Sequence, residues 1–266
     1  MILAVDIGNT RVRAALVEKG EVVALARVPT DSPGLVSRFR EAVARLADRA
    51  GRDRLRGAGI SSVVPALEGP VSQVIDELGI PRSRVEATHN ASIQVGYARP
   101  EELGPDRLAN AVAAKDRFGA PCLVLDLGTA LTLEVVDGGG ILRSGAIFPG
   151  MDAAGQALRT STARVDLVPG TPGPQGLLGD STAAAVTAGL TQGYSALIEG
   201  LASRGRQALG LEAPALLTGG GMRRLPGPLS GVTARDPFLT LRGIALLTAV
   251  PNARGAGGEK SRHKGP

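Results

Sequence analysis

Two segments of the chain place a carboxylate beside a glycine turn, a combination that suits a metal-bound polyphosphate. Residues 6–10 read Asp-Ile-Gly-Asn-Thr, and residues 126–129 read Asp-Leu-Gly-Thr. A carboxylate at the end of a strand can hold Mg²⁺, and the free backbone amides of a glycine turn can bind phosphate oxygens. Either segment alone could also be an ordinary turn, in which Asp, Asn and Gly are common residues.

The two segments belong to a longer repeat, which favours the ligand-binding interpretation. Residues 2–17 and 122–137 align without a gap at an offset of 120 residues, and each reads as a strand, an Asp, a Gly turn and a second strand. Two half-domains of this kind would face each other across a cleft, and each would deliver one carboxylate and one glycine-rich turn. We expect a nucleotide phosphate and its cation in that cleft, with Arg11 and Arg13 able to reach phosphate.

Two further segments could carry chemistry. Asp106 and Arg107 stand at the predicted start of a helix, where Asp106 could accept the proton of an attacking hydroxyl and Arg107 could hold an anion. An acid in the first turn of a helix is also favoured by the macrodipole, so a purely structural role stays open. Residues 219–221 are three glycines after an apolar strand, where the backbone could approach adenosine or simply form a turn.

Several other chemistries are excluded or disfavoured. The chain has no Gly-x-x-x-x-Gly-Lys-Ser/Thr segment, which excludes a P-loop. Its two histidines, His89 and His263, predict neither a metal cluster nor a hydrolase triad. Aromatic residues make up 2% of the chain and Trp is absent, so a stacking platform for single-stranded nucleic acid is not expected. The single cysteine, Cys122, lies in a predicted buried strand and is expected to be a core residue.

The net charge of +5 resides largely at the C-terminal end of the chain. Residues 251–266 are rich in Lys and Arg and nearly free of apolar side chains, so we predict a disordered basic tail there. The sequence shows no stretch of about 18 apolar residues and no charged leader before the first strand. We therefore expect a cytoplasmic protein with no membrane partner and no specific nucleic-acid partner.

Hydrophobic periodicity predicts the elements that position these residues. Each half opens with an antiparallel meander of three strands, expected at residues 1–6, 11–17 and 21–28 and again at 122–127, 130–136 and 140–147. Further strands are expected at residues 59–64, 84–88 and 214–218. Helices are expected at residues 35–46, 69–78, 105–118, 151–159, 181–208 and 239–249, and a Pro/Gly loop at 169–179.

Two meanders, each followed by helices and further strands, resemble the duplicated ribonuclease-H-like fold of the sugar kinase, actin and Hsp70 group of ATPases. The resemblance implies an α/β protein with two similar half-domains around a nucleotide cleft. The predicted halves are residues 1–118 and 119–250, with the boundary at residues 119–121, which read Gly-Ala-Pro.

Taken together, the motifs resemble the type III pantothenate kinases, bacterial enzymes of the first step of coenzyme A synthesis, from residue 1 to about residue 250. The features that carry this resemblance are Asp6-x-Gly8-Asn9-Thr10, Tyr97 ahead of Gly104-x-Asp106-Arg107, Asp126-x-Gly128-Thr129-Ala130-x-Thr132, Gly145 to Gly150, and Thr218-Gly219-Gly220. The resemblance implies ATP-dependent phosphorylation of pantothenate to 4′-phosphopantothenate, with Mg²⁺ and a potassium or ammonium ion. It also implies a homodimer in which the neighbouring subunit completes the substrate pocket.

The resemblance implies a role for individual residues as well. Asp106 would be the catalytic proton acceptor, and Asp6 and Asp126 would be metal ligands, with Asp126 holding the monovalent cation. The nucleotide would be bound by Asp6, Ile7, Gly8, Asn9, Thr10, Arg11, Val12, Arg13, Thr129, Gly219 and Gly220. The substrate pocket would be lined by Tyr97, Gly104, Pro105, Asp106, Arg107 and Thr182.

The chain departs from the family pattern in two places. It reads Gly-Asp-Ser-Thr at residues 179–182, where relatives usually show Gly-Lys-Asn-Thr, and Arg143-Ser144 replaces a commoner glycine pair. Two other functions stay open. One is a kinase of the same fold that acts on another small hydroxylated molecule, and the other is a non-catalytic, nucleotide-binding regulatory protein of the same family. The presence of Asp6, Asp106 and Asp126 favours catalysis.

Overall fold

Two β-sheets covered by helices make up the structure, a computed structural model that describes residues 1–89, 92–161 and 176–249. The first sheet has the order β3-β2-β1-β4-β5, formed by β1 (Ile2–Ile7), β2 (Arg11–Glu18), β3 (Glu21–Pro29), β4 (Gly57–Ser62) and β5 (Arg82–Arg84). The second has the order β11-β10-β7-β8-β9-β6, formed by β6 (Gln94–Val95), β7 (Cys122–Leu127), β8 (Ala130–Val136), β9 (Ile141–Pro149), β10 (Ala215–Thr218) and β11 (Ala234–Arg235).

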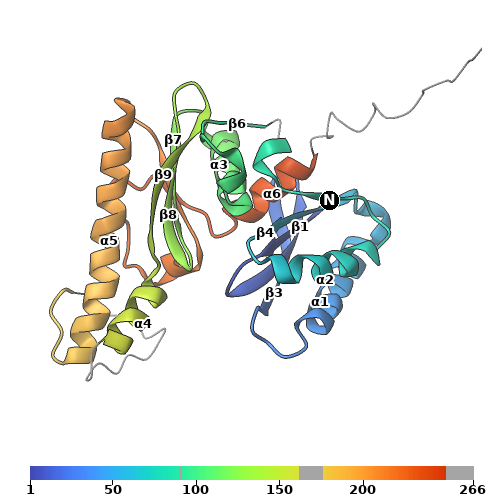
Figure 1. Ribbon diagram of the computed structural model, residues 1–266, viewed down its shortest axis with the longest axis horizontal. Helices are drawn as coiled ribbons and strands as arrows, with labels where there is room; N and C mark the ends of the chain where they lie inside the picture. The colour runs from blue at the N-terminus through green and yellow to red at the C-terminus, as the bar shows by residue number, and fades with distance from the viewer. Residues whose placement is uncertain (90–91, 162–175, 250–266) are drawn as a thin grey trace, which may run out of the picture.

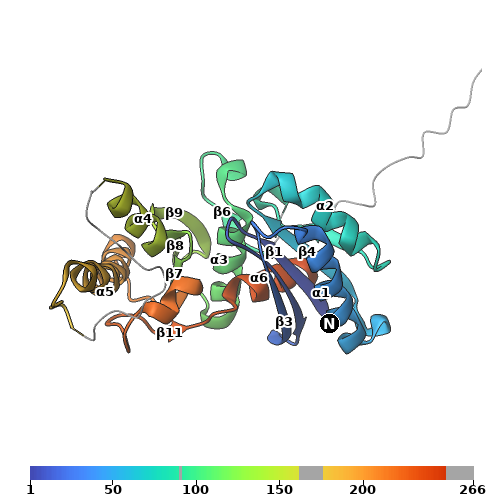
Figure 2. The same ribbon diagram turned by 90° about the horizontal axis from the view of Figure 1, so that it is seen from below.

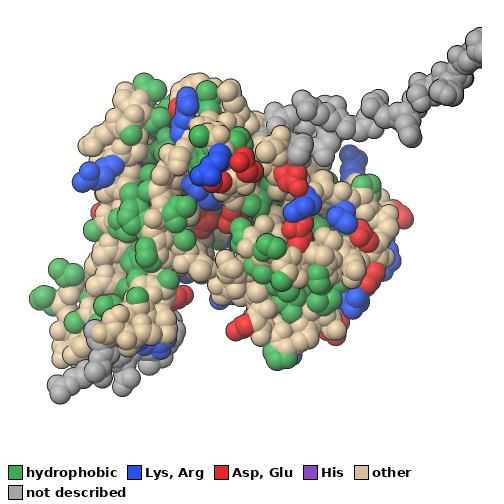
Figure 3. Space-filling model, in the orientation of Figure 1, with side chains coloured by type: hydrophobic (Ala, Val, Ile, Leu, Met, Phe, Trp, Pro, Cys, Tyr) green, Lys and Arg blue, Asp and Glu red, His purple; other side chains and the backbone are tan. Residues whose placement is uncertain are grey.

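The two sheets, each with helices packed against it, form two separate lobes (Figures 1 and 2). The helices are α1 (Leu35–Ala50), α2 (Pro65–Asp76), α3 (Pro105–Phe118), α4 (Met151–Ser161), α5 (Thr182–Leu209) and α6 (Leu239–Ala249). Helices α1 and α2 cover the outer face of the first sheet, α5 covers the outer face of the second, and α3 and α6 lie between the sheets. The space-filling view shows a notch between the lobes (Figure 3). The predicted α/β fold with two similar halves is confirmed.

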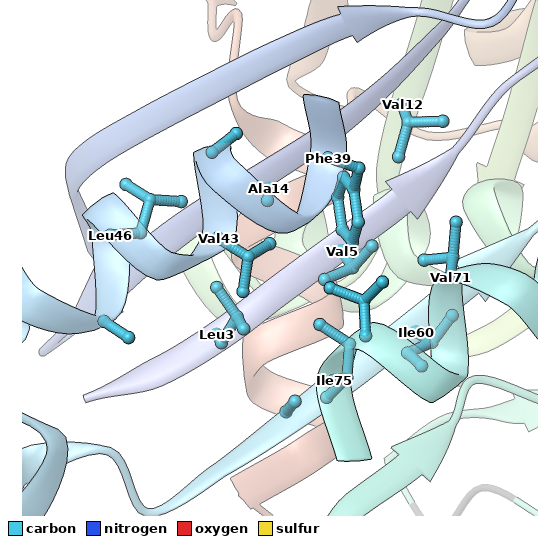
Figure 4. Packing of buried hydrophobic residues seen from close by; sticks show 14 of the residues in the cluster. Leu3, Val5, Val12, Ala14, Phe39, Val43, Leu46, Ile60, Val71 and Ile75 are labelled. Atoms are coloured by element: carbon cyan, nitrogen blue, oxygen red, sulfur yellow. The ribbon is translucent and has the colours of Figure 1, made fainter. Parts of the chain in front are cut away.

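Strand alternation sends the larger apolar side chains of the first sheet outward. In β1, Leu3 and Val5 pack against Phe39 of α1 and Ile75 of α2, as Figure 4 shows. The intervening Ala4 belongs instead to the core between the lobes, because successive side chains of a strand point to opposite faces. On the inner face, Ala4, Ala15 and Gly59 leave room for α6, since a Cβ on Gly59 would lie 2.8 Å from Ile244 of that helix.

The second sheet follows the same rule. Leu123 and Leu125 of β7 pack toward α5, whereas Cys122 and Val124 face α3 in the core between the lobes. Cys122 is fully buried, and burial raises its pKa to about 12, so the prediction of a core cysteine is confirmed.

Helices α3 and α6, which end the two halves of the chain, each pack against the sheet of the other half. Helix α3 packs against β7 and β8 of the second sheet, although it precedes both strands in the chain, while the last helix, α6, packs against β1 and β4 of the first. The two helices also cross closely, since a Cβ on Gly243 would lie 1.9 Å from the carbonyl oxygen of Ala109. Only glycine permits this approach.

Ion pairs reinforce the same layer. Asp236, which is 3% exposed, forms ion pairs with Arg117 of α3 at 3.3 Å and with Arg242 of α6 at 3.1 Å. Arg242 also reaches Glu21 of β3 at 2.9 Å. One arginine of the last helix thus joins the two lobes.

The strands of both meanders lie within two residues of their predicted positions. Helix α2 begins at Pro65, earlier than the predicted 69–78, because proline suits the first turn of a helix. The strands β6 and β11 have two residues each and were not predicted, since such short segments carry no periodicity. The predicted tail at 251–266 and most of the predicted loop at 169–179 lie outside the described residues. The boundary between residues 118 and 119 stays a prediction.

Candidate active site

Asp6 and Asp126 occupy equivalent positions in the two sheets. Asp6 lies between Arg13 of the antiparallel strand β2 and Ser61 of the parallel strand β4. Asp126 lies in the same way between Thr132 of β8 and Thr218 of β10. Strand alternation places both carboxylates on the inner faces, since Asp6 follows Ala4 by two residues and Asp126 follows Val124 by two. The repeat therefore makes two facing carboxylates.

The repeat is not gapless, which corrects the alignment expected from the sequence. In the first lobe Ile7 pairs with Val12, but in the second Leu127 pairs with Leu131, so the second turn is one residue shorter. The amide of Gly8 donates to Arg11 across the first turn at 3.0 Å, and a corresponding bond of 2.8 Å closes the second turn. The offset of 120 thus holds only as far as the turn.

One cleft of about 540 Å³ lies between the lobes and gathers most of the predicted site. Its lining includes Asp6, Gly8, Asn9, Thr10, Arg11, Arg13, Asp106, Asp126, Thr129, Gly219 and Gly220. The hydroxyl oxygens of Thr10 and Thr129 lie 3.1 Å apart, so the two turns touch across the cleft. The side chains of Ile7 and Val12 are fully buried in the outer core of the first lobe, which excludes a side-chain role in ligand binding for both.

Asp6 is held by a two-pronged ion pair. Arg13 donates to its Oδ2 from Nε at 3.0 Å and from Nη2 at 2.7 Å, and the hydroxyl of Ser61 lies 3.5 Å from Oδ1. Burial acts against the charge of Arg13, but the carboxylates of Asp6, Asp126 and Asp106 together more than offset it, and the pKa of Arg13 is raised. Oδ1 of Asp6 keeps capacity for a further ligand.

Asp126 is surrounded by oxygen atoms that lack partners. Its Oδ2 accepts the side-chain amide of Asn110 at 2.8 Å, and burial raises its pKa. Oδ1 of Asn110 and the hydroxyls of Thr132 and Thr218 are buried without a hydrogen-bond partner in the part of the chain that the structure describes. A Cβ on Gly219, where φ is +90°, would lie 2.4 Å from Oδ1 of Asp126, so the first residue of the glycine run has to be glycine.

Asp106 stands in the first turn of α3 and lines the same cleft as the other two carboxylates. Its Oδ1 accepts the backbone amide of Arg107 at 2.9 Å, and a Cβ on Gly104 would lie only 2.6 Å from the same oxygen. Burial, followed by the negative charges of Asp6 and Asp126, raises the pKa of Asp106 to about 6. The three carboxylates chosen from the sequence are therefore brought together.

Glu134 was missed by sequence reasoning. It is fully buried on β8, and its Oε1 accepts Nε of Arg107 at 2.8 Å. Burial raises the pKa of Glu134 to about 7 although Arg107 acts in the opposite direction. The guanidinium of Arg107 also lies 5.9 Å from the ring centre of Tyr97, so Glu134 holds one predicted substrate residue that in turn lies against another. A glutamate within the apolar segment 130–136 was the available signal.

Four predicted substrate residues lie outside the lining of the cleft: Tyr97, Gly104, Pro105 and Arg107. Thr182 does not line the cleft either, and it is exposed at the first residue of α5. The preceding Ser181 caps this helix by accepting the amide of Ala184 at 3.2 Å. Serine and asparagine are both good N-caps, so the departure at Ser181 preserves the helix start.

Comparison with known proteins decides the family. A model of the type III pantothenate kinase family matches residues 2–204 of the chain. The type III pantothenate kinase of a Roseiflexus species is 33% identical over 253 residues, which cover 93% of this chain and 98% of that protein. The enzyme of the same description from Thermomicrobium roseum is 35% identical over 248 residues, which cover 92% and 95%. The chain belongs to the type III pantothenate kinase family.

Solved structures agree on the fold of this type III pantothenate kinase family member. A candidate N-acetylmannosamine kinase from Listeria monocytogenes superposes with a TM-score of 0.50 and 15% identity, over 92% of this chain and 97% of that chain. At this identity the likeness shows the fold alone. Among the described helices, none has both the length and the apolar character that a membrane crossing requires.

The residues present fit the cations expected of a kinase in this family. The buried oxygens around Asp126 form a donor set of carboxylate, amide and hydroxyl groups, which suits a hard cation. Within residues 1–89, 92–161 and 176–249, no group of three or more His, Cys, Asp or Glu side chains is arranged to hold a metal. Mg²⁺ is commonly bound through one or two carboxylates together with substrate phosphates, so a full protein cage is not needed.

Proposed function

We propose that this chain transfers the γ-phosphoryl group of ATP to the primary hydroxyl of pantothenate, which gives 4′-phosphopantothenate for coenzyme A synthesis. The observation that carries the proposal is the convergence of Asp6, Asp106 and Asp126 on one cleft in a member of this kinase family. Two of these carboxylates come from the repeated turns, and the third comes from the helix between the lobes.

Asp106 is the proton acceptor in this proposal. Its carboxylate takes the proton of the attacking hydroxyl while the hydroxyl oxygen bonds to the γ-phosphorus. The bond from that phosphorus to the β,γ-bridging oxygen breaks, and ADP leaves. A pKa of about 6 leaves Asp106 ionised at neutral pH, yet more basic than an ordinary aspartate.

The nucleotide is held by both lobes. Backbone amides at Gly8, Asn9 and Thr10 and the hydroxyl of Thr129 bind phosphate oxygens, and Arg13 shares its charge between Asp6 and the phosphates. Asp6 is the protein ligand for Mg²⁺, which when bound neutralises phosphate charge. Gly219 and Gly220 let the backbone approach adenosine.

Asp126 holds the monovalent cation in this proposal, together with Oδ1 of Asn110 and the hydroxyls of Thr132 and Thr218. All four groups are oxygen donors of the kind that potassium accepts, and three of them lack a partner in the described chain. The cation would offset the charge of Asp126 close to the phosphates, which is electrostatic stabilisation rather than chemistry.

Arg107, held by Glu134, meets the carboxylate of pantothenate, with Tyr97, Gly104 and Pro105 beside it. A homodimer completes this pocket in the proposal, because Thr182 is exposed and does not line the cleft of its own chain. A cytoplasmic location is proposed on the use of ATP and on the single buried thiol.

The test is ADP release by the purified chain, with pantothenate or potassium present or omitted. We expect release that requires pantothenate and is stimulated by potassium. Asp106→Asn should fold normally and lose about 10²- to 10⁴-fold in kcat, the usual range for a general base. Asp116→Asn, an exposed acid on the same helix, is the matched control and should keep the parental rate.

The opposing outcomes are distinct. If Asp106→Asn matches the parent, the assignment of the base is wrong. If Asp126→Ala keeps its full activation by potassium, the cation site is wrong. ATP binding without turnover would favour the regulatory alternative, and turnover with another hydroxylated substrate would favour the second kinase alternative.

A further inference from the structure

Three carboxylates and two arginines that line the cleft lie at different depths. Asp6 is buried, and Asp106 and Asp126 are half-buried at the ends of their elements. Arg27 and Arg223 line the same cleft but are exposed, which places them at its rim. Apart from Asp152, which is exposed and paired with Arg224, the acids of the cleft thus lie deeper than Arg27 and Arg223.

The two rim arginines lack ionic partners. Of the other arginines in the cleft, Arg13 is paired with Asp6 and Arg224 with Asp152, whereas the exposed Arg11 forms no ion pair in the described part of the chain. Arg11 belongs to the same lobe as Arg27, so Arg223 is the unpaired arginine that the second lobe brings to the cleft. Neither Arg27 nor Arg223 forms an ion pair within the described part of the chain. Two guanidinium groups at the mouth of a cleft thus have unused donor capacity.

Arg27 and Arg223 approach from opposite lobes. Arg27 lies on β3 directly across from Arg13 of β2, so both side chains stand on the same face of the first sheet. Arg223 lies in the short helix η4 (Gly220–Arg224), which follows the glycine run of the second lobe. Burial and the nearby positive charges of Arg223, Arg13 and Arg11 lower the pKa of Arg27. The basic groups repel one another across the cleft, and an anion between them would relieve this repulsion.

We propose that Arg27 and Arg223 form a clamp, one jaw from each lobe, that binds the polyphosphate of the nucleotide. The clamp rests on the proposed use of ATP and adds two residues to that site. A guanidinium presents a planar fork of donors that matches phosphate oxygens, and its bonds to phosphate are strengthened by charge. Such a clamp favours a chain of phosphates over a single phosphate, because a polyphosphate offers each guanidinium its own charged oxygens.

The experiment is calorimetric titration of the full chain with ATP, ADP and AMP, in Mg²⁺ and without pantothenate. Arg27→Gln and Arg223→Gln should each weaken ATP binding about tenfold, the scale of one charge-assisted hydrogen bond, and should change AMP binding less than about twofold. Arg45→Gln is the matched control. Arg45 is an exposed arginine of α1 with only a 3.8 Å contact to Glu41, and its replacement should leave all three affinities unchanged.

The double variant adds two independent readouts. It should lose less ATP affinity than the product of the two single losses, because each jaw depends on the other. Without ligand, its thermal unfolding temperature should equal or exceed that of the parent, since a repulsion has been removed. A clear fall in that temperature would assign the two arginines a structural role and overturn the clamp.

The proposal is also overturned if Arg27→Gln and Arg223→Gln bind ATP as tightly as Arg45→Gln. That result would leave the proposed function intact, because the parent would still bind ATP and phosphorylate pantothenate. If the parent itself does not bind ATP, the proposed function and the clamp both fail.

Discussion

Asp106 combines two properties that favour a base over a structural acid. It stands in the first turn of α3, where the macrodipole favours a negative charge, yet its pKa is raised from 3.8 to about 6. Burial is the largest cause, and the charges of Asp6 and Asp126 act in the same direction. The two neighbouring carboxylates therefore contribute to the raised pKa of Asp106.

The rate should depend on pH through this group. Protonated Asp106 cannot accept a proton, so kcat/KM should fall about tenfold per pH unit below about pH 6 and level off above it. The measurement is the pH profile of pantothenate phosphorylation from roughly pH 5 to pH 8. An acidic limb near pH 4, the ordinary range for an aspartate, would contradict the raised pKa.

The same shift predicts a stability effect. Between pH 3.8 and about pH 6 the folded protein binds more protons at Asp106 than the unfolded chain does, so stability falls as pH rises through this window. At pH 7 the full penalty remains, and a rise from 3.8 to about 6 corresponds to at most about 3 kcal/mol. The inactive Asp106→Asn should therefore have the higher free energy of unfolding at pH 7, measured by urea denaturation.

Glu134 and Arg107 form a buried ion pair whose loss should be costly. Glu134→Ala leaves a buried guanidinium without its carboxylate, so we expect the free energy of unfolding to fall by about 3–5 kcal/mol. Glu41→Ala removes an exposed pair with Arg45 and should change it by less than about 0.5 kcal/mol. If urea denaturation gave equal losses for the two variants, the buried pair would contribute no more to the free energy of unfolding than the exposed pair does.

At the scale of residues, the sequence predicts the site residues that occur in both copies of the repeat. Asp6 and Asp126 stand out because the same acid and glycine occur twice, and the alternation of each strand then orients them. Glu134 and Arg27 have no matching residue in the other copy of the repeat that would single them out in the sequence. Their roles depend on which helix or strand packs opposite them, and that register is set by contacts between segments distant in sequence.

At the scale of elements, the close crossing of α3 and α6 holds the lobes in place. Gly243→Ala would put a Cβ 1.9 Å from the carbonyl oxygen of Ala109 and force the helices apart. We expect a loss of at least about 1–3 kcal/mol in the free energy of unfolding, as for other overpacked sites. Thermal or urea unfolding measures it.

Gly189 provides the control for this prediction. It is an exposed glycine within α5, and a Cβ there would meet nothing within 4 Å. Gly189→Ala should therefore stabilise the protein by about 0.5–1 kcal/mol, the helix preference of alanine over glycine. If both variants change stability alike, the crossing is not the cause.

The elements themselves were largely predictable, because helix and strand periods are local properties. The meander strands and the long helix α5 follow directly from the spacing of apolar residues. The exchange of α3 and α6 between the sheets was not predictable, since no local pattern states which sheet a helix covers. The shorter second turn was missed because an ungapped match of acid and glycine hides one deleted residue.

At the scale of the whole molecule, exposed apolar residues favour the proposed homodimer. Ile147 of β9 is 63% exposed and lies in register with Thr132, which belongs to the proposed cation site. Leu178, just before Thr182, is 91% exposed. A second copy that covers such residues could bring its own Thr182 to the pocket of the first.

The dimer should be visible in solution. The parent should sediment at about twice the chain mass of 27.1 kDa, and Ile147→Asp should shift it toward the monomer and raise the KM for pantothenate about tenfold or more. Val23→Asp, at a 42% exposed position of β3, should do neither. A fully active monomeric parent would contradict this proposal.

The crossed helices also bear on how such a molecule could have arisen. Each half ends in a helix that covers the other half's sheet, which is the arrangement that two copies of an ancestral half-length chain would form by domain swapping. Neither segment produced on its own would then have its inner sheet face protected from water. Residues 1–118 and 119–250, made as separate polypeptides, are expected to assemble with each other, and each is expected to aggregate when alone.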